Sequence, residues 1–230
     1  LGDELDPWGI KFVFTPVQEI DRDHHARGGR MAYTASEPDG SYSVCTTGFT
    51  VQSEAGINGV TTAAHCTGMS NFDAEAPEAD FPLYHKGEHC ETYGDVEWKG
   101  SDHSEPAEFW ANHNDLRAVE SVARAFSVND VYCVYSRIQG TRTCDYVFST
   151  STSQTGTLGY CLGRTAYNLV AFDNDLTVPG DSGGPISYST QAAGTIKGAK
   201  YLWYSYRGTM TRADLFNSAL GVQVKLSARQ

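Results

Sequence analysis

The sequence has no long apolar run and little positive charge. None of its segments approaches the roughly 18 consecutive apolar residues that a transmembrane helix needs, so we expect no membrane-spanning helix. Its 28 Asp and Glu residues outnumber its 17 Lys and Arg residues, which gives a formal net charge of −11. Such an acidic chain is not expected to bind nucleic acid or an anionic membrane surface.

Long stretches rich in Leu, Ala, Glu and Lys are also missing. Gly, Ser, Thr, Tyr and Val are abundant instead, which favours short strands and turns over helices. The first residues, L-G-D-E-L-D-P-W, show neither the basic nor the apolar region of a secretion signal. We therefore expect any such signal to have been removed or to lie outside this chain. With 230 residues, the chain can bury the core of one large all-β domain or of two small ones.

The six cysteines include no C-x-x-C pair, and the chain has no N-x-S/T glycosylation sequon. An even number of cysteines without metal-ligand spacing predicts three disulfides, and hence a secreted protein, better than it predicts a zinc site. His85, His89 and Cys90 could suggest a metal site, but Gly87 and the absence of helical periodicity favour an exposed loop. We expect no metal and no cofactor.

The pattern along the chain predicts two successive β units. Residues 1–27 are predicted to be an N-terminal extension with one strand-like piece at 10–14, and 41–66 to form two strands around a Gly/Asn turn. The polar stretch 67–94 is predicted to be loop-like. The segment D-V-E-W (95–98) is predicted to be a short strand with Val96 and Trp98 on one face, and strands and turns alternate over 131–210.

One helix is predicted near the C-terminus. Thr211 can cap it and Gly221 can end it, with an apolar stripe between them at Leu215, Phe216, Ala219 and Leu220. Two β units followed by a helix are typical of an all-β double barrel.

The segment V-P-G-D-S-G-G-P (178–185) has the composition of a turn that presents a nucleophilic serine. Gly180 puts no side chain in the way of a substrate carbonyl, so its N–H group and that of Ser182 can both bind a developing oxyanion. Ser182 would need a histidine as base and a carboxylate to orient that histidine. In T-A-A-H-C, small residues clear space beside His65 and the cysteine can fix its loop.

Together, T-A-A-H-C and G-D-S-G-G-P resemble the chymotrypsin-like serine proteases, and the details are similar to the bacterial streptogrisin-type branch. The resemblance covers about residues 28–226. It includes the glycine pair Gly28-Gly29, the strand C-T-T-G-F-T-V (45–51), the segment C-V-Y-S-R-I-Q-G-T-R-T-C (133–144) and L-F-N-S-A-L-G-V-Q-V (215–224). It implies two six-stranded antiparallel β-barrels with a C-terminal helix. The first barrel would be 28–116, with His and Asp, and the second 117–230, with Ser.

The resemblance also implies roles for single residues. His65 is the base, Ser182 the nucleophile, and the N–H groups of Gly180 and Ser182 the oxyanion hole. The acid is expected in a short strand of the first barrel, where Asp95 in G-D-V-E-W fits better than Asp102 or Asp115, which suit turns or caps. The resemblance pairs Cys45 with Cys66 and Cys133 with Cys144, and Cys90–Cys161 remains by elimination.

The chain departs from the family around the substrate pocket. Val178 stands where many relatives have a cysteine, and no cysteine follows Cys161, so that bridge is absent. The pocket is expected to comprise residues 176–179 (Leu176, Thr177, Val178 and Pro179) and residues 197–199 (Lys197, Gly198 and Ala199). Leu176 at the pocket floor offers no acidic group for Lys or Arg side chains. An inward Lys197 would favour acidic substrates, whereas an outward Lys197 would leave an apolar pocket, which we consider the better reading.

Asp181 precedes the serine, and in animal relatives it pairs with a new N-terminal amine. The bacterial branch uses an arginine instead, for which Arg137 and Arg142 are the candidates. We predict a secreted, monomeric serine endopeptidase that acts on proteins or peptides. The alternative is a catalytically silent pseudoprotease that serves as a binding or signalling module, which Lys197 and the missing bridge favour slightly. A separate hypothesis is that residues 1–27 inhibit the enzyme.

Overall fold

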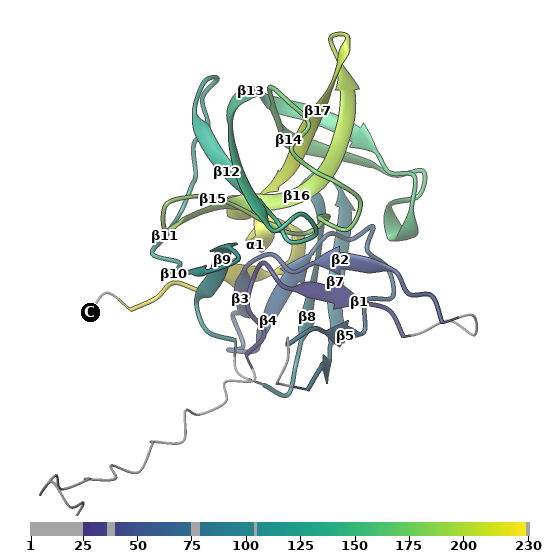
Figure 1. The fold of residues 1–230 in the computed structure, drawn as a ribbon, viewed down its shortest axis with the longest axis vertical. Coiled ribbons are helices and arrows are strands. Elements are labelled where there is room, and N and C mark those ends of the chain that lie inside the picture. Colours follow the sequence, from purple (N-terminus) through teal and green to yellow (C-terminus); the bar gives the residue numbers. More distant parts are fainter. Residues whose placement is uncertain (1–24, 36–39, 75–78, 104, 229–230) are drawn as a thin grey trace, which may run out of the picture.

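The computed structural model describes residues 25–35, 40–74, 79–103 and 105–228. These residues form two β-rich halves, one above the other in Figure 1, with the later part of the chain forming the upper half. The apolar run 10–14 and most of the predicted extension lie outside the described residues. Of that extension, Ala26 is fully buried in the lower half, and Arg27 pairs with Glu108 at 2.8 Å.

Two main sheets and a hairpin build the lower half. One sheet has the order β18-β3-β4-β8-β7 and the other the order β2-β1-β5-β6. The strands are β1 (Met31–Tyr33), β2 (Val44–Thr46), β3 (Thr50–Ser53), β4 (Asn58–Thr62), β5 (Asn71–Phe72), β6 (Phe81–Pro82), β7 (Tyr84–Glu91), β8 (Gly94–Gly100) and β18 (Val222–Val224). The hairpin pairs β9 (Glu108–Asn112) with β10 (Asp115–Ala118).

The upper half is a closed ring of strands. The sheet runs β16-β15-β12-β13-β14-β17, and β17 also pairs with β16, so the six strands close on themselves. A short strand, β11, joins β16 in parallel. The bounds are β11 (Ser121–Val122), β12 (Val131–Ser136), β13 (Thr141–Thr155), β14 (Thr165–Phe172), β15 (Pro185–Tyr188), β16 (Gln191–Leu202) and β17 (Ser205–Arg212). The predicted all-β double barrel is confirmed, although among the described residues only the upper half forms one continuous six-stranded ring.

Each half has its own apolar core, and the alternation along β8 shows how the sequence produces it. Val96 and Trp98 point into the lower core, as predicted for one face of this strand, where they meet Phe49 and Phe109. The intervening polar residues of β8 face the other way and are buried as well. The upper core is lined by Val134, Val147, Val170, Phe172, Ile186, Ile196 and Met210.

The chain returns to the lower half at its C-terminal end. A 3-10 turn, η2 (Ala213–Leu215), leads into α1 (Phe216–Leu220), and Gly221 ends this helix in the left-handed region at φ 69°. Phe216 lies in the lower core, and β18 pairs with β3. The helix and the last strand thus pack against the first half, although the predicted division placed them with the second. No helix of the described chain is long and apolar enough to cross a membrane.

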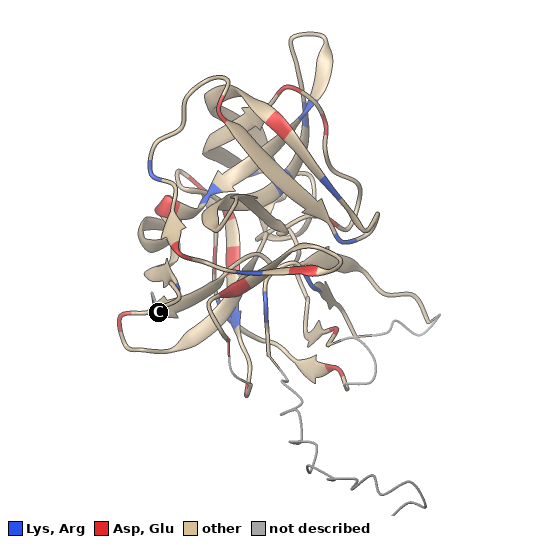
Figure 2. Cartoon of the chain, turned by 60° about the vertical axis from the view of Figure 1, so that its left-hand side comes forward, with Lys and Arg blue, Asp and Glu red and all other residues tan. Residues whose placement is uncertain are grey.

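The polar stretch 67–94 contains strands β5, β6 and β7, and not only the predicted loop. In β7, His85 and His89 belong to an eight-residue strand whose first half is exposed. Such an edge strand can carry polar residues on its open side, so its sequence looks like a loop. Figure 2 shows acidic and basic positions interspersed over both halves in that view.

Three disulfides form, with the expected pairings. Cys45–Cys66 and Cys133–Cys144 each lie within one half. Cys90–Cys161 links β7 of the lower half to the short 3-10 helix η1 (Gly159–Cys161) of the upper half. This last bridge therefore holds the two halves together.

Candidate active site

His65 and Asp95 meet in the lower half, close to the boundary between the two halves. His65 follows β4, and its ring Nδ1 lies 2.7 Å from Asp95 Oδ2, while its backbone N–H donates to Asp95 Oδ1 at 3.1 Å. Asp95 is on β8 and is fully buried. Two contacts from one carboxylate fix both the ring and the backbone of His65, which leaves the other ring nitrogen for a substrate or a nucleophile.

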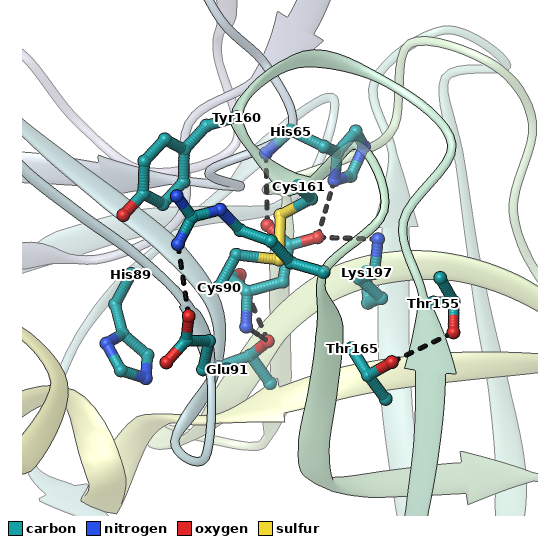
Figure 3. The surroundings of a disulfide bond; sticks show 12 residues. His65, His89, Cys90, Glu91, Thr155, Tyr160, Cys161, Thr165 and Lys197 are labelled. Atoms are coloured by element: carbon teal, nitrogen blue, oxygen red, sulfur yellow. Dashed lines mark hydrogen bonds and ion pairs between the residues drawn. A yellow bond between two sulfur atoms is a disulfide. The ribbon is translucent and has the colours of Figure 1, made fainter.

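The carboxylate of Asp95 has a second cationic partner. Lys197 on β16 places its Nζ 2.6 Å from Asp95 Oδ2, the oxygen that also faces His65 (Figure 3). Burial raises the pKa of the Asp95 carboxyl, but the hydrogen bond and charge of His65 and the charge of Lys197 outweigh it, so the pKa lies below its ordinary value. The carboxylate is therefore held in its ionised form.

Thr211 holds the backbone of Asp95. Its hydroxyl accepts a hydrogen bond from Asp95 N at 2.9 Å and donates one to Asp95 O at 3.0 Å. Thr211 is fully buried on β17, so it does not cap the C-terminal helix as predicted. The helix begins later because the strand continues to Arg212, and a β-branched residue with a hydroxyl suits a strand end as well as a cap.

The turn around Ser182 has two unused N–H groups. Asp181 N donates to Val178 O at 3.0 Å and Gly183 N donates to Ile196 O at 2.8 Å. Within the part of the chain that the structure describes, the N–H groups of Gly180 and Ser182 donate to no protein atom. The φ of +100° at Gly180 is one that side chains rarely adopt, and an added Cβ would lie 3.0 Å from the side chain of Ile138. The turn can therefore offer two donors to one oxyanion.

Backbone contacts tie the serine turn to the histidine loop. Thr46 N donates to Ser182 O at 2.8 Å, and the preceding Cys45 is bonded to Cys66, the neighbour of His65. Among the described residues, the Ser182 hydroxyl forms no hydrogen bond with His65. In structures without substrate, such catalytic hydrogen bonds are often long and tighten only in the complex.

Asp181 is buried behind the turn, where it accepts several hydrogen bonds. Its carboxylate receives them from the Ser136 hydroxyl at 2.9 Å and from the N–H group of Val178 at 3.0 Å, with Ile138 N farther away at 3.4 Å. Burial raises the pKa of this carboxyl, and these hydrogen bonds oppose the rise.

Neither candidate arginine accounts for the position of Asp181 among the described contacts. The Arg137 guanidinium lies 3.9 Å from Asp73, while Arg142 shares its surroundings with Asp115 and Arg117. The loop is shaped instead by a hydroxyl and by backbone N–H groups, one of them from Arg137 itself. These donors satisfy a carboxylate without a counter-charge.

The alternative acids lie elsewhere. Asp102 accepts a hydrogen bond from the Tyr84 hydroxyl at 3.0 Å, and Asp115 forms an ion pair with Arg117. Both carboxylates therefore have other partners, and Asp95 is the carboxylate that the fold brings to His65.

Two of the predicted pocket residues, Leu176 and Ala199, are neighbours of Gly208. Leu176 packs against the upper core. Its backbone nitrogen lies close to Gly208, 3.5 Å from where a Cβ of that residue would stand. Gly208 on β17 pairs with Ala199 on β16. The predicted segments thus approach each other across β17, and Gly208 is a neighbour that sequence reasoning did not name.

Lys197 does not face the predicted pocket. The register of β16 shifts between Ile196 and Gly198, and this bulge turns the Lys197 side chain toward Asp95, where it is 5% exposed. The remaining segment residues stay near the surface: Thr177 bonds Asp175, Pro179 is exposed, and Gly198 has open space where a Cβ would stand.

The fold is similar to that of known bacterial serine proteases. Protease A of Thermobifida fusca aligns with a TM-score of 0.68 and 19% identity over 87% of this chain and 98% of its own. A Cellulomonas bogoriensis chymotrypsin gives 0.64 and 21% over 87% and 98%. A glutamic-acid-specific serine protease gives 0.67 and 22% over 87% and 100%.

These likenesses assign the chain to a class by its fold. It has the fold of the chymotrypsin-like serine proteases, in the form found in bacteria. No protein-family model and no curated protein sequence matches the chain. The shared fold together with the low identity indicates that the architecture persists where most of the sequence has changed.

Proposed function

We propose that the protein is a secreted serine endopeptidase that hydrolyses peptide bonds through Ser182, His65 and Asp95. The observation that carries this proposal is the combination of the His65–Asp95 pair with a serine turn whose Gly180 and Ser182 N–H groups have no acceptor among the described residues. An oriented imidazole that remains partly exposed and two unused donors are what acyl transfer requires.

The proposed reaction follows from these positions. Ser182 Oγ attacks the carbonyl carbon of the scissile bond while His65 Nε2 accepts its proton, and the carbonyl oxygen becomes an oxyanion held by Gly180 and Ser182 N–H. His65 then donates the proton to the leaving amine, which departs and leaves an acyl-enzyme. Water, deprotonated by His65, attacks this ester. His65 then returns the proton to Ser182 Oγ as the ester C–O bond breaks, which releases the carboxylic acid and restores the serine hydroxyl. Asp95 stabilises the protonated imidazole throughout.

We further propose a preference for apolar side chains next to the scissile bond. Leu176 and Ala199 are apolar members of the predicted pocket, and Lys197, the residue that would attract an acidic side chain, is engaged with Asp95. A charged side chain in a pocket without a counter-charge loses hydration without compensation. Peptides with Phe or Leu at this position should be cleaved at least about 100-fold faster than those with Glu or Arg. A library profile dominated by Glu or Arg would exclude this pocket assignment.

A fluorophosphonate probe tests the activity directly, because it reacts with an activated serine whatever the substrate. The wild type should be labelled at one site, found by mass spectrometry at Ser182, and Ser182→Ala should abolish the label. Ser187→Ala on the next strand is the matched control and should retain it. If the folded wild type stays unlabelled under conditions that label a known protease, the enzyme proposal fails and the pseudoprotease alternative is favoured.

Secretion and a monomeric state complete the proposal. Three disulfides support an oxidising, extracellular location, because such bonds do not persist in reducing compartments. Reducing and non-reducing electrophoresis of protein recovered from the natural producer would test the location. Light scattering would test the monomer.

A further inference from the structure

Lys197 occupies an unusual place beside the candidate catalytic pair. Its side chain is 5% exposed, and its Nζ lies 2.6 Å from the same Asp95 oxygen that faces His65 Nδ1 at 2.7 Å. The lysine comes from β16 of the upper half, whereas His65 and Asp95 come from the lower half. In Figure 3, dashed lines from the labelled Lys197 and His65 mark these two interactions. One buried carboxylate therefore serves two nitrogen groups at once.

Among the described residues, the other groups around this carboxylate supply no comparable charge. β17 presents the Thr211 hydroxyl, which is engaged with the Asp95 backbone. The Cys90–Cys161 disulfide, which does not titrate, has sulfur atoms within 4.8 Å of an Asp95 oxygen. Lys197 is thus the cation that compensates Asp95 when His65 is neutral.

Titratable groups on neighbouring elements have other partners. On β7, Glu91 pairs with Arg164 at 3.0 Å, and the ring of His89 lies against that of Tyr93. On the serine side, Asp181 is bound by Ser136 and by backbone N–H groups. Among the described residues, His65 and Lys197 are therefore the ionisable groups that share the Asp95 carboxylate.

We propose that Lys197 is a positioning residue that fixes the Asp95 carboxylate for His65. Lys197 also offsets part of the charge of that carboxylate, so that His65 loses its proton at a lower pH than it would beside an uncompensated carboxylate. This inference rests on the proposed protease function. An imidazole beside a fully uncompensated carboxylate stays protonated to a higher pH, and a protonated His65 cannot act as a base. The expected consequence is activity that extends further into the acidic range.

Two variants separate the charge of Lys197 from its positioning role. Lys197→Met keeps the length and apolar stem but removes the charge and the hydrogen bond. Lys197→Ser supplies a short, neutral hydroxyl that can still donate a hydrogen bond. Lys99→Met is the matched control, because Lys99 is equally buried and is paired with Glu97 at 2.5 Å instead of Asp95.

The main measurement is kcat/KM against pH with a fast peptide substrate. In Lys197→Met, the midpoint of the acid limb should move up by at least about 1 pH unit, since an adjacent charge shifts a titration by roughly that much or more. Its plateau kcat should fall about tenfold with little change in KM, because ring orientation and not substrate binding is lost. Lys197→Ser should recover much of the plateau while its acid limb stays shifted. Lys99→Met should leave the midpoint in place.

A second readout does not need turnover. The His65 ring proton signals, followed by NMR against pH, should titrate at a higher pH in Lys197→Met than in the wild type and in Lys99→Met. If the wild type neither cleaves nor labels, the protease proposal fails, and this titration still decides the role of Lys197. An unchanged or lower titration midpoint in both Lys197 variants, with the fold retained by circular dichroism, would overturn the inference.

Discussion

The Thr211 hydroxyl gives a sharp test of how the candidate site is held. It is fully buried and bonds both backbone groups of Asp95, at 2.9 Å and 3.0 Å. Thr211→Val replaces the hydroxyl by a methyl group of similar size and keeps the methyl that packs on Gly94. The substitution thus removes two hydrogen bonds with almost no change in volume.

The expected loss follows from the two groups left without partners. A buried backbone N–H or C=O that loses its hydrogen bond costs about 1–3 kcal/mol, so Thr211→Val should lower the free energy of unfolding by about 2–5 kcal/mol. Thr211→Ser keeps the hydroxyl and loses one methyl group, which should cost only about 1 kcal/mol. The valine variant should also lose kcat, because Asp95 is no longer held in register with His65.

Urea unfolding followed by tryptophan fluorescence measures both variants, with disulfides intact and reversibility checked by refolding. The order of midpoints should be wild type, then serine, then valine, with the larger step to valine. If valine is as stable as serine, or more stable, Asp95 does not depend on this hydroxyl and the reasoning is refuted.

Three further predictions concern the same region. Gly180→Ala puts a Cβ at φ +100° and 3.0 Å from Ile138, so kcat should fall at least about 100-fold in steady-state assays. Gly163→Ala, the control, is also at positive φ but in open space and should not lower kcat. Equal kcat values for the two variants would contradict the oxyanion role of Gly180. Because the pKa of Asp95 lies below its ordinary value of 3.8, its contribution to stability is present above that pH and is lost as the pH falls through the lower pKa of the folded state. In urea unfolding, the stability advantage of wild type over Asp95→Asn should therefore shrink at acidic pH. An advantage that does not change with pH would refute the prediction. Replacing Cys90 and Cys161 by serine should lower the free energy of unfolding by about 2–5 kcal/mol, and an unchanged urea midpoint would show that the bridge does not constrain the unfolded chain.

The two contiguous motifs could be recognised from the sequence because a short run of small residues around a serine or a histidine is uncommon outside sites where that side chain must be accessible. T-A-A-H-C and G-D-S-G-G-P each place a reactive side chain among residues that clear space for it. The family resemblance implies an acid in a short strand of the first half, and D-V-E-W offers Asp95 there. The fold class followed from the same motifs together with the cysteines. These are local features, so a single sequence reveals them.

Other contacts could not be predicted because they depend on register between distant strands. Lys197 meets Asp95 through a bulge between Ile196 and Gly198, and nothing in I-K-G-A specifies where that bulge falls. The prediction of Thr211 as a helix cap is wrong because threonine is suited both to helix caps and to the ends of strands, and here it lies on β17. Strand β7 was assigned to a loop because one side of an edge strand is open to solvent and can be polar.

The pairing of β18 with β3 has a consequence for synthesis of the chain. Residues 222–224 complete a sheet whose other strands lie far earlier in the sequence. While the chain is being made, β3 is an exposed edge with unpaired backbone groups, and the lower core lacks Phe216, Val222 and Val224. The half that carries His65 and Asp95 can therefore be completed only after residues 222–224 have been made, so a nascent chain that ends before them would lack a finished candidate site.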